Sequence, residues 1–279
     1  MSDDLQKLAL KLGQDGPVKS TPAIRMIQLL LNGIYIIRTT KAIFVHEHEY
    51  YPQLYIPLSE FTSKAAHPSL KVSQGQKYTS PTGELLATQL KLQIGPKTIN
   101  NVLAFAADLS GNAAQLSNLV KIDFDSIDKW FEEDTQIYIH PKDPFKRVDI
   151  LQSSRHIRVR VGGKIVADSQ SCMHLYETGL PCRYYLPLTS IDASVLRPSQ
   201  TKTGCPYKGE AEYYHVNVDG KVYEDVVWYY TRPLLESIKI EGLCCFYNEK
   251  VEIELNGQIL DSPETPFSNR KPNDKPSFL

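Results

Sequence analysis

The sequence predicts a mainly β protein made of two tandem, small antiparallel β domains with short helices. One observation is an internal repeat: residues 31–61 align without a gap with residues 161–191, at a constant offset of 130 residues that matches Glu47 to Glu177. Solenoid repeats have about 20–50 residues, so this longer period indicates two copies of a whole domain. Both copies also contain short β-rich runs ended by turn residues or proline. The length of 279 residues suits two domains of ordinary size.

The first copy follows an N-terminal helical extension over residues 1–27. Within that extension, residues 3–12 predict a short helix that Gly13 and Gly16 end. The first β domain, the degenerate copy, covers residues 28–135. Its predicted strands are residues 34–37, 42–47 and 53–57.

The later part of this domain is less regular in sequence. Residues 85–94 and 101–107 favour a strand followed by a helical turn. Residues 126–133 predict a short helix with Ser126 as its N-cap, because a serine side chain can accept from the first free backbone N–H groups.

A connector with two prolines covers residues 136–154, and proline prevents a regular central strand or helix there. The second β domain covers residues 155–258 and is expected to bear the site. Its Val218-Asp-Gly-Lys221 segment is typical of a hairpin, because Asp-Gly suits a tight turn. Its predicted strands are residues 156–161, 164–168, 173–177, 183–186, 212–218, 221–230 and 251–255. Residues 259–279 are rich in Pro, Ser, Asn and charge and predict a disordered tail.

Composition excludes several classes of function. The formal net charge of −1 lacks the basic footprint that nucleic-acid binding needs. No apolar run reaches the ~20 residues of a membrane span, so we expect no membrane partner. The first residues lack the features of a signal peptide, so we expect an intracellular, cytoplasmic protein. We find no phosphate-binding loop or dinucleotide motif and expect no cofactor. The sequence leaves the oligomeric state open.

The sequence does not predict a metal site. The five cysteines are an odd number without a Cys-x-x-Cys pair, which is typical of reduced thiols. His46 and His48 share one face of a predicted strand while Glu47 points to the other face, so the three do not form a ligand cluster. Without four ligands in close pairs we expect no metal, and we interpret the histidines as an ordinary surface pair.

Several motifs of the second copy resemble a known family. They are Arg155-His-Ile-Arg-Val-Arg-Val-Gly-Gly163, Thr203-Gly-Cys-Pro-Tyr-Lys-Gly209 and Val227-Trp-Tyr-Tyr230. Over residues 28–258 the chain resembles the domain of unknown function 427 family in its tandem form. The resemblance implies a β domain of tent-like shape for each copy. Relatives of that fold often bind zinc, but the ligands are lacking here, and the resemblance implies no reaction.

Glu177 is a candidate acid or base. It ends an apolar strand, and alternation places it on the same face as Met173 and Leu175. A carboxylate on the core-facing side needs a partner or a raised pKa, and either suits proton transfer. The alternative is a buried carboxylate that holds a turn through backbone hydrogen bonds. Its presence in both copies fits both interpretations.

Lys208 and Cys205 belong to the second copy alone. The aligned segment of the first copy reads Ser80-Pro-Thr-Gly-Glu84, which retains the proline and loses both residues. A lysine in a rigid loop can bind an anion, or act as a base when desolvated. The alternative is a solvated loop lysine. Cys205 is a candidate nucleophile beside a cation, and its alternative is an inert buried thiol.

Arg183 and Tyr185 share a strand face, where a guanidinium and a phenol can bind a carboxylate or a phosphate. The first copy has glutamine in place of Arg183 and, near the position of Trp228, Phe105. We interpret Trp228 as core packing that can also line a pocket. Thr203 opens the loop segment and joins the candidate binding residues.

Together these residues predict a small-molecule pocket in the second domain. The first hypothesis is a cofactor-independent enzyme of the lyase, isomerase or hydrolase type, acting on a small anionic or carbonyl metabolite. Glu177 would move a proton, while Lys208 and Tyr185 would stabilise negative charge. The substrate-binding residues would be Arg183, Thr203, Cys205 and Trp228. The alternative is a non-catalytic metabolite- or peptide-binding module, or a scaffold.

Overall fold

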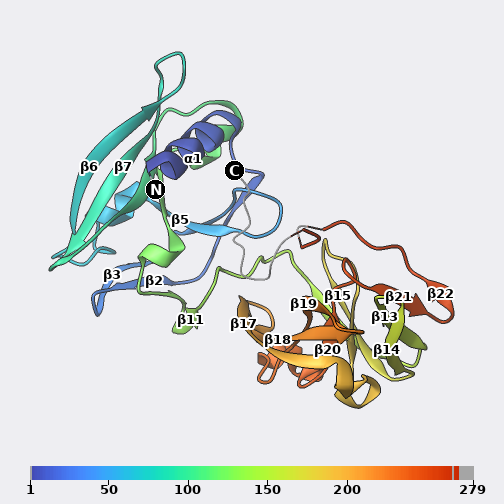
Figure 1. Cartoon of the computed structure of the whole chain (residues 1–279). Helices are drawn as coiled ribbons and strands as arrows, with labels where there is room; N and C mark the ends of the chain where they lie inside the picture. The colour runs from blue at the N-terminus through green and yellow to red at the C-terminus, as the bar shows by residue number, and fades with distance from the viewer. Residues whose placement is uncertain (1, 266, 270–279) are drawn as a thin grey trace. The chain divides into compact units, whose positions relative to one another are not determined.

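Each half of the chain folds into a seven-stranded and a four-stranded antiparallel sheet. The computed structural model describes residues 2–265 and 267–269 (Figure 1). These residues divide between Asp143 and Pro144 into a first and a second unit. The division lies inside the predicted connector.

In the first unit the seven-stranded sheet has the order β1-β4-β5-β9-β8-β7-β6, and the four-stranded sheet has the order β11-β10-β2-β3. Helix α1 (Ser2–Asp15) precedes both sheets. The strands are β1 (Lys19–Pro22), β2 (Ile27–Leu31), β3 (Ile34–Thr39), β4 (Ile43–His46), β5 (Gln53–Pro57), β6 (Lys71–Thr79), β7 (Leu85–Ile94), β8 (Lys97–Phe105), β9 (Leu119–Ile122), β10 (Lys129–Glu132) and β11 (Thr135–Ile137). Short 3₁₀ helices are η1 (Leu58–Thr62), η2 (Gly111–Leu116) and η3 (Phe124–Ser126).

The second unit repeats this topology. Its sheets have the orders β12-β15-β16-β20-β19-β18-β17 and β14-β13-β21-β22, which are the orders of the first unit with each strand replaced by its counterpart. The strands are β12 (Val148–Ser153), β13 (Ile157–Val161), β14 (Lys164–Ser169), β15 (Cys172–Glu177), β16 (Arg183–Leu186), β17 (Leu196–Cys205), β18 (Gly209–Val218), β19 (Lys221–Tyr229), β20 (Cys244–Phe246), β21 (Glu252–Leu255) and β22 (Gln258–Ile259). Its 3₁₀ helices are η4 (Leu188–Ser190), η5 (Ala193–Val195) and η6 (Leu235–Ile240). The prediction of two tandem antiparallel β domains is confirmed.

The main core of each unit lies between its two sheets. In the second unit, Val159 of β13 and Leu186 of β16 are fully buried in one apolar cluster, so residues of both sheets share it. Side chains along β13 alternate between buried and partly buried, as the period of a strand requires. The predicted hairpin joins β18 to β19, with Asp219 at φ +50° and Gly220 at φ +82°, the pair of positive values that a type I′ turn needs.

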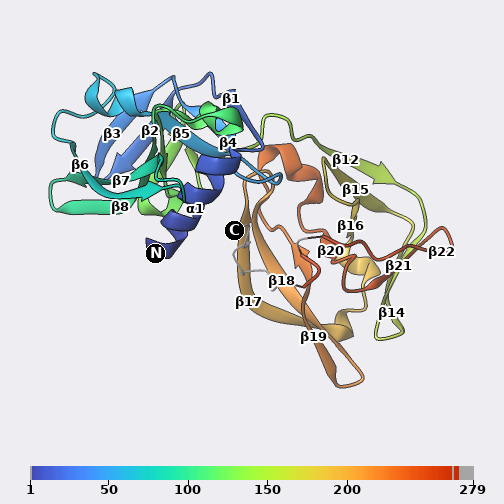
Figure 2. The same cartoon turned by 90° about the horizontal axis from the view of Figure 1, so that it is seen from above.

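Each seven-stranded sheet also buries side chains on the face that points away from the four-stranded sheet, here called the outer face. In the first unit, α1 lies against strands β7 and β8 (Figure 2). Its Leu8, Ala9 and Leu12 belong to one apolar cluster with Tyr55 and other sheet residues, so the helix covers this face. The spacing of these helix residues gives one apolar stripe. Gly16, at φ +77°, donates to Leu12 O and ends the helix.

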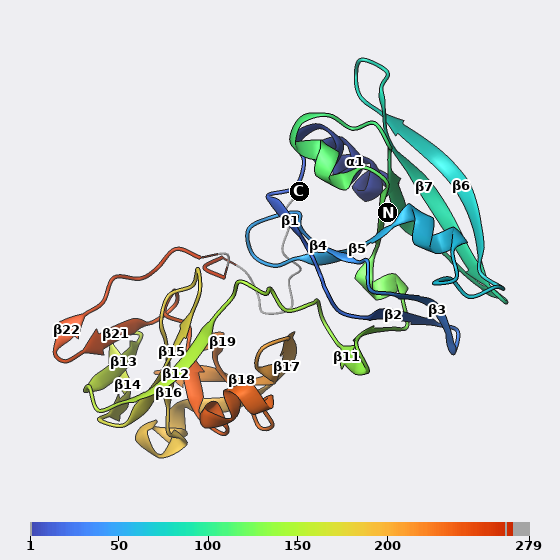
Figure 3. The same ribbon diagram turned by 180° about the vertical axis from the view of Figure 1, so that it is seen from behind.

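The outer face of the second unit carries no α-helix among the described residues. Its cluster is rich in aromatic side chains, and Phe267 packs against it. Several members come from strands β16, β18 and β19, which Figure 3 shows from behind. The members are Ile150, Leu175, Tyr185, Ala211, Tyr213, Trp228, Tyr230, Ile240, Cys245 and Tyr247. The two copies therefore differ most on this face.

The predicted helical extension over residues 1–27 is too long, because residues 19–22 form strand β1 and pair with β4. Three further local predictions were wrong. Residues 129–132 form strand β10 rather than a helix, because Trp130 pairs with Leu29 of β2 and is buried in the core. Residues 101–105 belong to strand β8 rather than to a helical turn, since they pair with both β7 and β9. Residues 148–153 of the expected connector form β12, an edge strand of the second sheet. Tertiary pairing outweighs local propensity in all three.

The described part of the expected tail makes specific contacts. Ser262 Oγ donates to Asn248 O over 3.0 Å, and Thr265 N donates to Ser268 Oγ over 2.9 Å. Residues 261–265 and 267–269 thus differ from the expected disorder, and the rest of the tail lies outside the described residues. No helix among the described residues is long and apolar enough to span a membrane.

Candidate functional site

The Glu177 carboxylate lies between two lysine side chains of the second unit. Glu177 ends β15, Lys208 lies in the turn between β17 and β18, and Lys146 precedes β12. Lys208 Nζ donates to Glu177 Oε2 over 2.6 Å, and Lys146 Nζ lies 3.4 Å from Glu177 Oε1. None of the three side chains is more than 13% exposed. We call these residues the lysine–glutamate cluster.

The turn that carries Lys208 is fixed by backbone contacts. Lys208 N donates to Cys205 O over 3.3 Å, and Leu234 N donates to Lys208 O over 3.0 Å. Gly209 has φ +102°, and a Cβ there would lie 3.3 Å from Arg232 O. Glycine is therefore favoured at this position. Lys208 is held in place with its side chain 11% exposed, so it is not a solvated loop lysine.

Both charges of the Lys208–Glu177 pair are stabilised. Burial acts to raise the pKa of Glu177, but Lys208 and then Lys146 outweigh it and lower that pKa. Burial acts to lower the pKa of Lys208, but Cys205 and the Glu177 carboxylate, which accepts a hydrogen bond from Lys208, outweigh burial and raise that pKa. Glu177 is thus a carboxylate and Lys208 an ammonium at neutral pH.

Arg183 is engaged within the protein. Its guanidinium donates to both carboxylate oxygens of Glu249, over 2.7 and 2.6 Å, and the Glu249 side chain is 0% exposed. Thr265 Oγ1 also donates to Glu249, and the ring of Trp228 lies 5.6 Å from the guanidinium carbon. This bidentate pair occupies the two guanidinium N–H groups that would otherwise bind the carboxylate or phosphate of a ligand. These contacts make Arg183 a poor candidate for the substrate anchor that the sequence suggested.

Tyr185 and Trp228 form a buried pair on the outer face. Trp228 Nε1 donates to Tyr185 OH over 3.0 Å, and the two rings are nearly perpendicular with centroids 6.1 Å apart. Burial raises the pKa of Tyr185 well above its ordinary value, and the Cys245 thiol adds to the rise. The phenol therefore stays protonated at neutral pH, which argues against proton transfer through a phenolate.

Thr203 and Cys205 lie near this pair. Thr203 Oγ1 and Tyr213 OH share a hydrogen bond of 2.8 Å. Cys205 is a partly buried free cysteine that acts on the pKa of both Lys208 and Tyr185, so it lies close to both. The fold thus brings together the candidate residues that the sequence singled out.

Four residues of this region were missed by sequence reasoning. Lys146 stands in the expected connector, and Glu249 lies three residues after the end of β20. Tyr213 and Tyr247 line the outer face with Trp228. Strand alternation along residues 212–218 was the one available signal, since it places Tyr213 on the same face as Ala211.

The first unit pairs its carboxylate differently. Glu47 Oε1 accepts from Lys121 Nζ over 2.6 Å and from Tyr55 OH over 2.9 Å. Lys121 of β9 lies opposite Tyr55, and Cys245 of β20 lies opposite Tyr185, the counterpart of Tyr55. Lys121 is therefore equivalent to Cys245. The first copy therefore has one lysine for its carboxylate, and the second copy has two from other segments.

The same register locates the counterpart of Trp228. Trp228 stands opposite Cys245, and in the first unit Leu103 stands opposite Lys121. Leu103, rather than the expected Phe105, is thus the equivalent residue. The first unit has an aliphatic side chain where the second has an indole with a hydrogen-bond donor.

The histidines of the first unit are not a surface pair. His46 is 0% exposed and lies 3.2 Å from Asp143 Oδ2. Burial lowers the pKa of His48 to about 4 and also lowers that of His46, so both rings are neutral at pH 7. Among the described residues, no three His, Cys, Asp or Glu side chains are grouped so that they could hold a metal ion.

Comparison with known families agrees with the duplication. A family model described as Domain of unknown function (DUF427) matches the chain twice, over residues 19–133 and residues 149–257. The two matches together span well over half of the chain, one in each unit. No curated protein matches the sequence.

Proposed function

The chain belongs to the DUF427 family in a tandem, two-copy form, and we propose that its second unit binds a small organic anion at Lys146 and Lys208. The ligand would carry a carboxylate or a phosphate. The first unit would be a structural copy without this site.

The observation that carries the proposal is the charge balance of the lysine–glutamate cluster. Two ammonium groups lie within 3.4 Å of one carboxylate, so the cluster keeps one positive charge in a largely buried place. A charge held away from water is costly unless it is paired. A bound anion would supply the missing partner.

The first unit provides the contrast within the same chain. Its Lys121–Glu47 pair is balanced one to one, and α1 covers the outer face beside it. The single lysine of that pair, Lys121, has a carboxylate partner of its own. At this position, among the described residues, the second unit therefore has a positive charge in excess and the first unit has a balanced pair.

The contacts favour binding over catalysis. Two lysines hold Glu177 ionised, so it is a weak base and a poor acid at neutral pH. Tyr185 keeps its proton, and Arg183 is occupied by Glu249. Each group that the enzyme hypothesis needs is satisfied within the protein. The aromatic cluster beside the lysines would contact the apolar part of the ligand.

The free thiols support a proposed location in the cytoplasm. All five cysteines are free, which fits a reducing environment. We therefore keep the cytoplasm as the proposed location and expect a metabolite of that compartment as the ligand.

Thermal unfolding against a panel of small carboxylates and phosphates tests the proposal. A ligand at about 100 times its Kd adds roughly 2.7 kcal/mol to the free energy of unfolding. The shift should vanish in Lys208→Ala and persist in Lys202→Ala, a lysine of the same unit whose side chain is 56% exposed. Equal shifts in both variants, or no shift with any member of the panel, would refute the site.

A further inference from the structure

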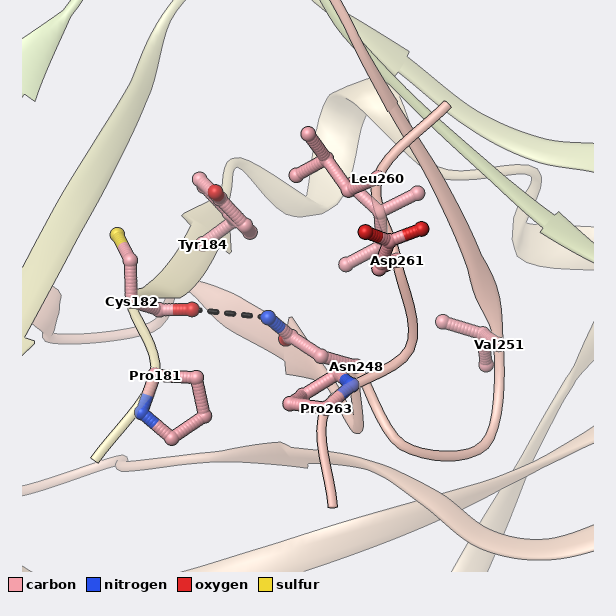
Figure 4. Close-up of a pocket in the computed structure, with 9 residues that line it drawn as sticks. Pro181, Cys182, Tyr184, Asn248, Val251, Leu260, Asp261 and Pro263 are labelled. Atoms are coloured by element: carbon pink, nitrogen blue, oxygen red, sulfur yellow. Dashed lines mark hydrogen bonds between the residues drawn. The ribbon is translucent and has the colours of Figure 1, made fainter. Parts of the chain in front are cut away.

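A cavity in the second unit lies apart from the lysine–glutamate cluster. It measures about 140 Å³, is partly open to solvent, and is lined by the segment before β16, the loop around Asn248, strand β21 and residues 260–263 (Figure 4). Its walls include Cys182, Tyr184, Val251 and Leu260. Tyr184 belongs to the core between the two sheets, whereas Tyr185 belongs to the outer face. Because neighbouring strand residues point to opposite faces, the cavity and the lysine–glutamate cluster are separate sites.

One polar atom in the wall lacks a partner. Asn248 is 8% exposed, and its Nδ2 donates to Cys182 O over 2.9 Å, which fixes the amide (Figure 4). Its Oδ1 is buried and has no hydrogen-bond partner among the described residues. A buried acceptor left unpaired costs about 1–3 kcal/mol. A ligand with a hydrogen-bond donor would therefore satisfy this part of the wall.

The charge of the residues that line the cavity also favours a cationic ligand. Asp261 is exposed and lines the cavity, and none of the described lining residues is Lys, Arg or His. The two guanidinium groups that act on the Cys182 thiol are engaged elsewhere, Arg155 with His174 and Arg183 with Glu249. A carboxylate at the opening and an amide oxygen inside favour a cationic donor.

The size limits the ligand. An engineered cavity of about 150 Å³ holds a benzene molecule, so about 140 Å³ has room for a similar number of heavy atoms. Val251, Ile253 and Leu260 supply apolar wall. We propose that this cavity binds a small primary ammonium ion on a short apolar chain. The ammonium would donate to Asn248 Oδ1 and to Asp261, with the chain against the aliphatic side chains.

The test titrates the full-length protein with n-butylammonium chloride and follows two-dimensional ¹H–¹⁵N NMR signals. The side-chain amide of Asn248 and the backbone amides of Cys182 and Val251 should shift and saturate. Matched titrations use n-butanol, which lacks the charge, and sodium butyrate, which reverses it. We expect n-butanol to bind at least about tenfold more weakly, the factor that 1.4 kcal/mol gives, and butyrate to leave these signals unchanged.

Two variants and their controls locate the site. Asp261→Asn should weaken n-butylammonium binding about tenfold, the effect of 1.4 kcal/mol, whereas Asp219→Asn, in the exposed hairpin turn, should not. Val251→Phe should fill the cavity and abolish the shifts, whereas Val222→Phe, on an exposed strand position, should keep them. If Val251→Phe does not fold, the n-butylammonium affinity of Asp261→Asn alone tests the proposal. No saturable shift, equal binding of n-butanol, or an unchanged affinity in Asp261→Asn would overturn the proposal.

Discussion

Lys208 donates to Glu177 over 2.6 Å although 31 residues separate them in the sequence. In the first unit the equivalent carboxylate, Glu47, takes its lysine from β9 instead, over the same 2.6 Å. Both copies have the carboxylate, but its lysine comes from strand β9 in the first unit and from the turn between β17 and β18 in the second. In both copies the carboxylate therefore forms an ion pair with a lysine. One lysine is enough for that pair, so the pairing does not explain the second lysine beside Glu177, Lys146.

Acid should weaken the second unit through Glu177 and Glu249. The pKa of each carboxyl is lowered in the folded protein, by Lys208 and Lys146 for Glu177 and by Arg183 for Glu249. A lowered pKa gives stability that is present above the unfolded value of about 4.3 and is lost as pH falls through the folded value. The free energy of urea unfolding should therefore fall steeply below about pH 4.

The measurement can isolate the second unit, because each unit contains one tryptophan, Trp130 and Trp228. Trp228 fluorescence in a Trp130→Phe background reports on the second unit. The destabilising effect of Glu177→Gln should be smaller at pH 3 than at pH 7. An effect that does not change with pH would mean that the Glu177 pKa is not lowered.

Breaking the Arg183–Glu249 pair should destabilise the second unit without changing anion affinity. Arg183→Met leaves a buried carboxylate unpaired, which costs about 3–5 kcal/mol. Arg183→Met combined with Glu249→Leu should recover part of that loss, since both charges are then removed. Urea unfolding measures the first effect and calorimetric titration the second. A loss of anion binding in the folded double variant would restore Arg183 as a ligand anchor.

Helix α1 should stabilise the first unit alone. Leu12 is 1% exposed against the outer face, and a buried Leu→Ala change costs about 2–5 kcal/mol. Trp130 fluorescence in a Trp228→Phe background should report this loss for Leu12→Ala. Leu5, at 9% exposure near the start of the helix, provides a milder comparison. An equal loss of stability in Leu5→Ala and Leu12→Ala would contradict the expectation that the more deeply buried Leu12 contributes more.

Removing the Tyr185 hydroxyl should affect stability and not chemistry. Tyr185→Phe leaves Trp228 Nε1 buried without its acceptor, which costs about 1–3 kcal/mol. Anion affinity and its pH dependence should stay as in the wild type, measured by calorimetry between pH 6 and 9 at about 25 °C. A changed pH profile would indicate that the phenol takes part in the site.

Sequence reasoning reached the repeat, the hairpin and the strand faces because each depends on local rules. Alternation placed Met173, Leu175 and Glu177 together, and both apolar residues pack on the outer face. It could not reach β10 or β12, because both strands are stabilised by partners far away in the sequence. Lys146 and Glu249 were missed for the same reason: a charge in a loop acquires its partner only when the chain folds.

The affinity of Glu177→Gln for inorganic phosphate and acetate, relative to the wild type, tests the anion site most directly. Calorimetric titration at constant ionic strength, with chloride as the balancing salt, keeps screening equal. Removing the internal carboxylate frees both lysines, so we expect the affinity of the folded variant to rise about tenfold, which corresponds to 1.4 kcal/mol. An unchanged or lower affinity would contradict an anion site at Lys146 and Lys208.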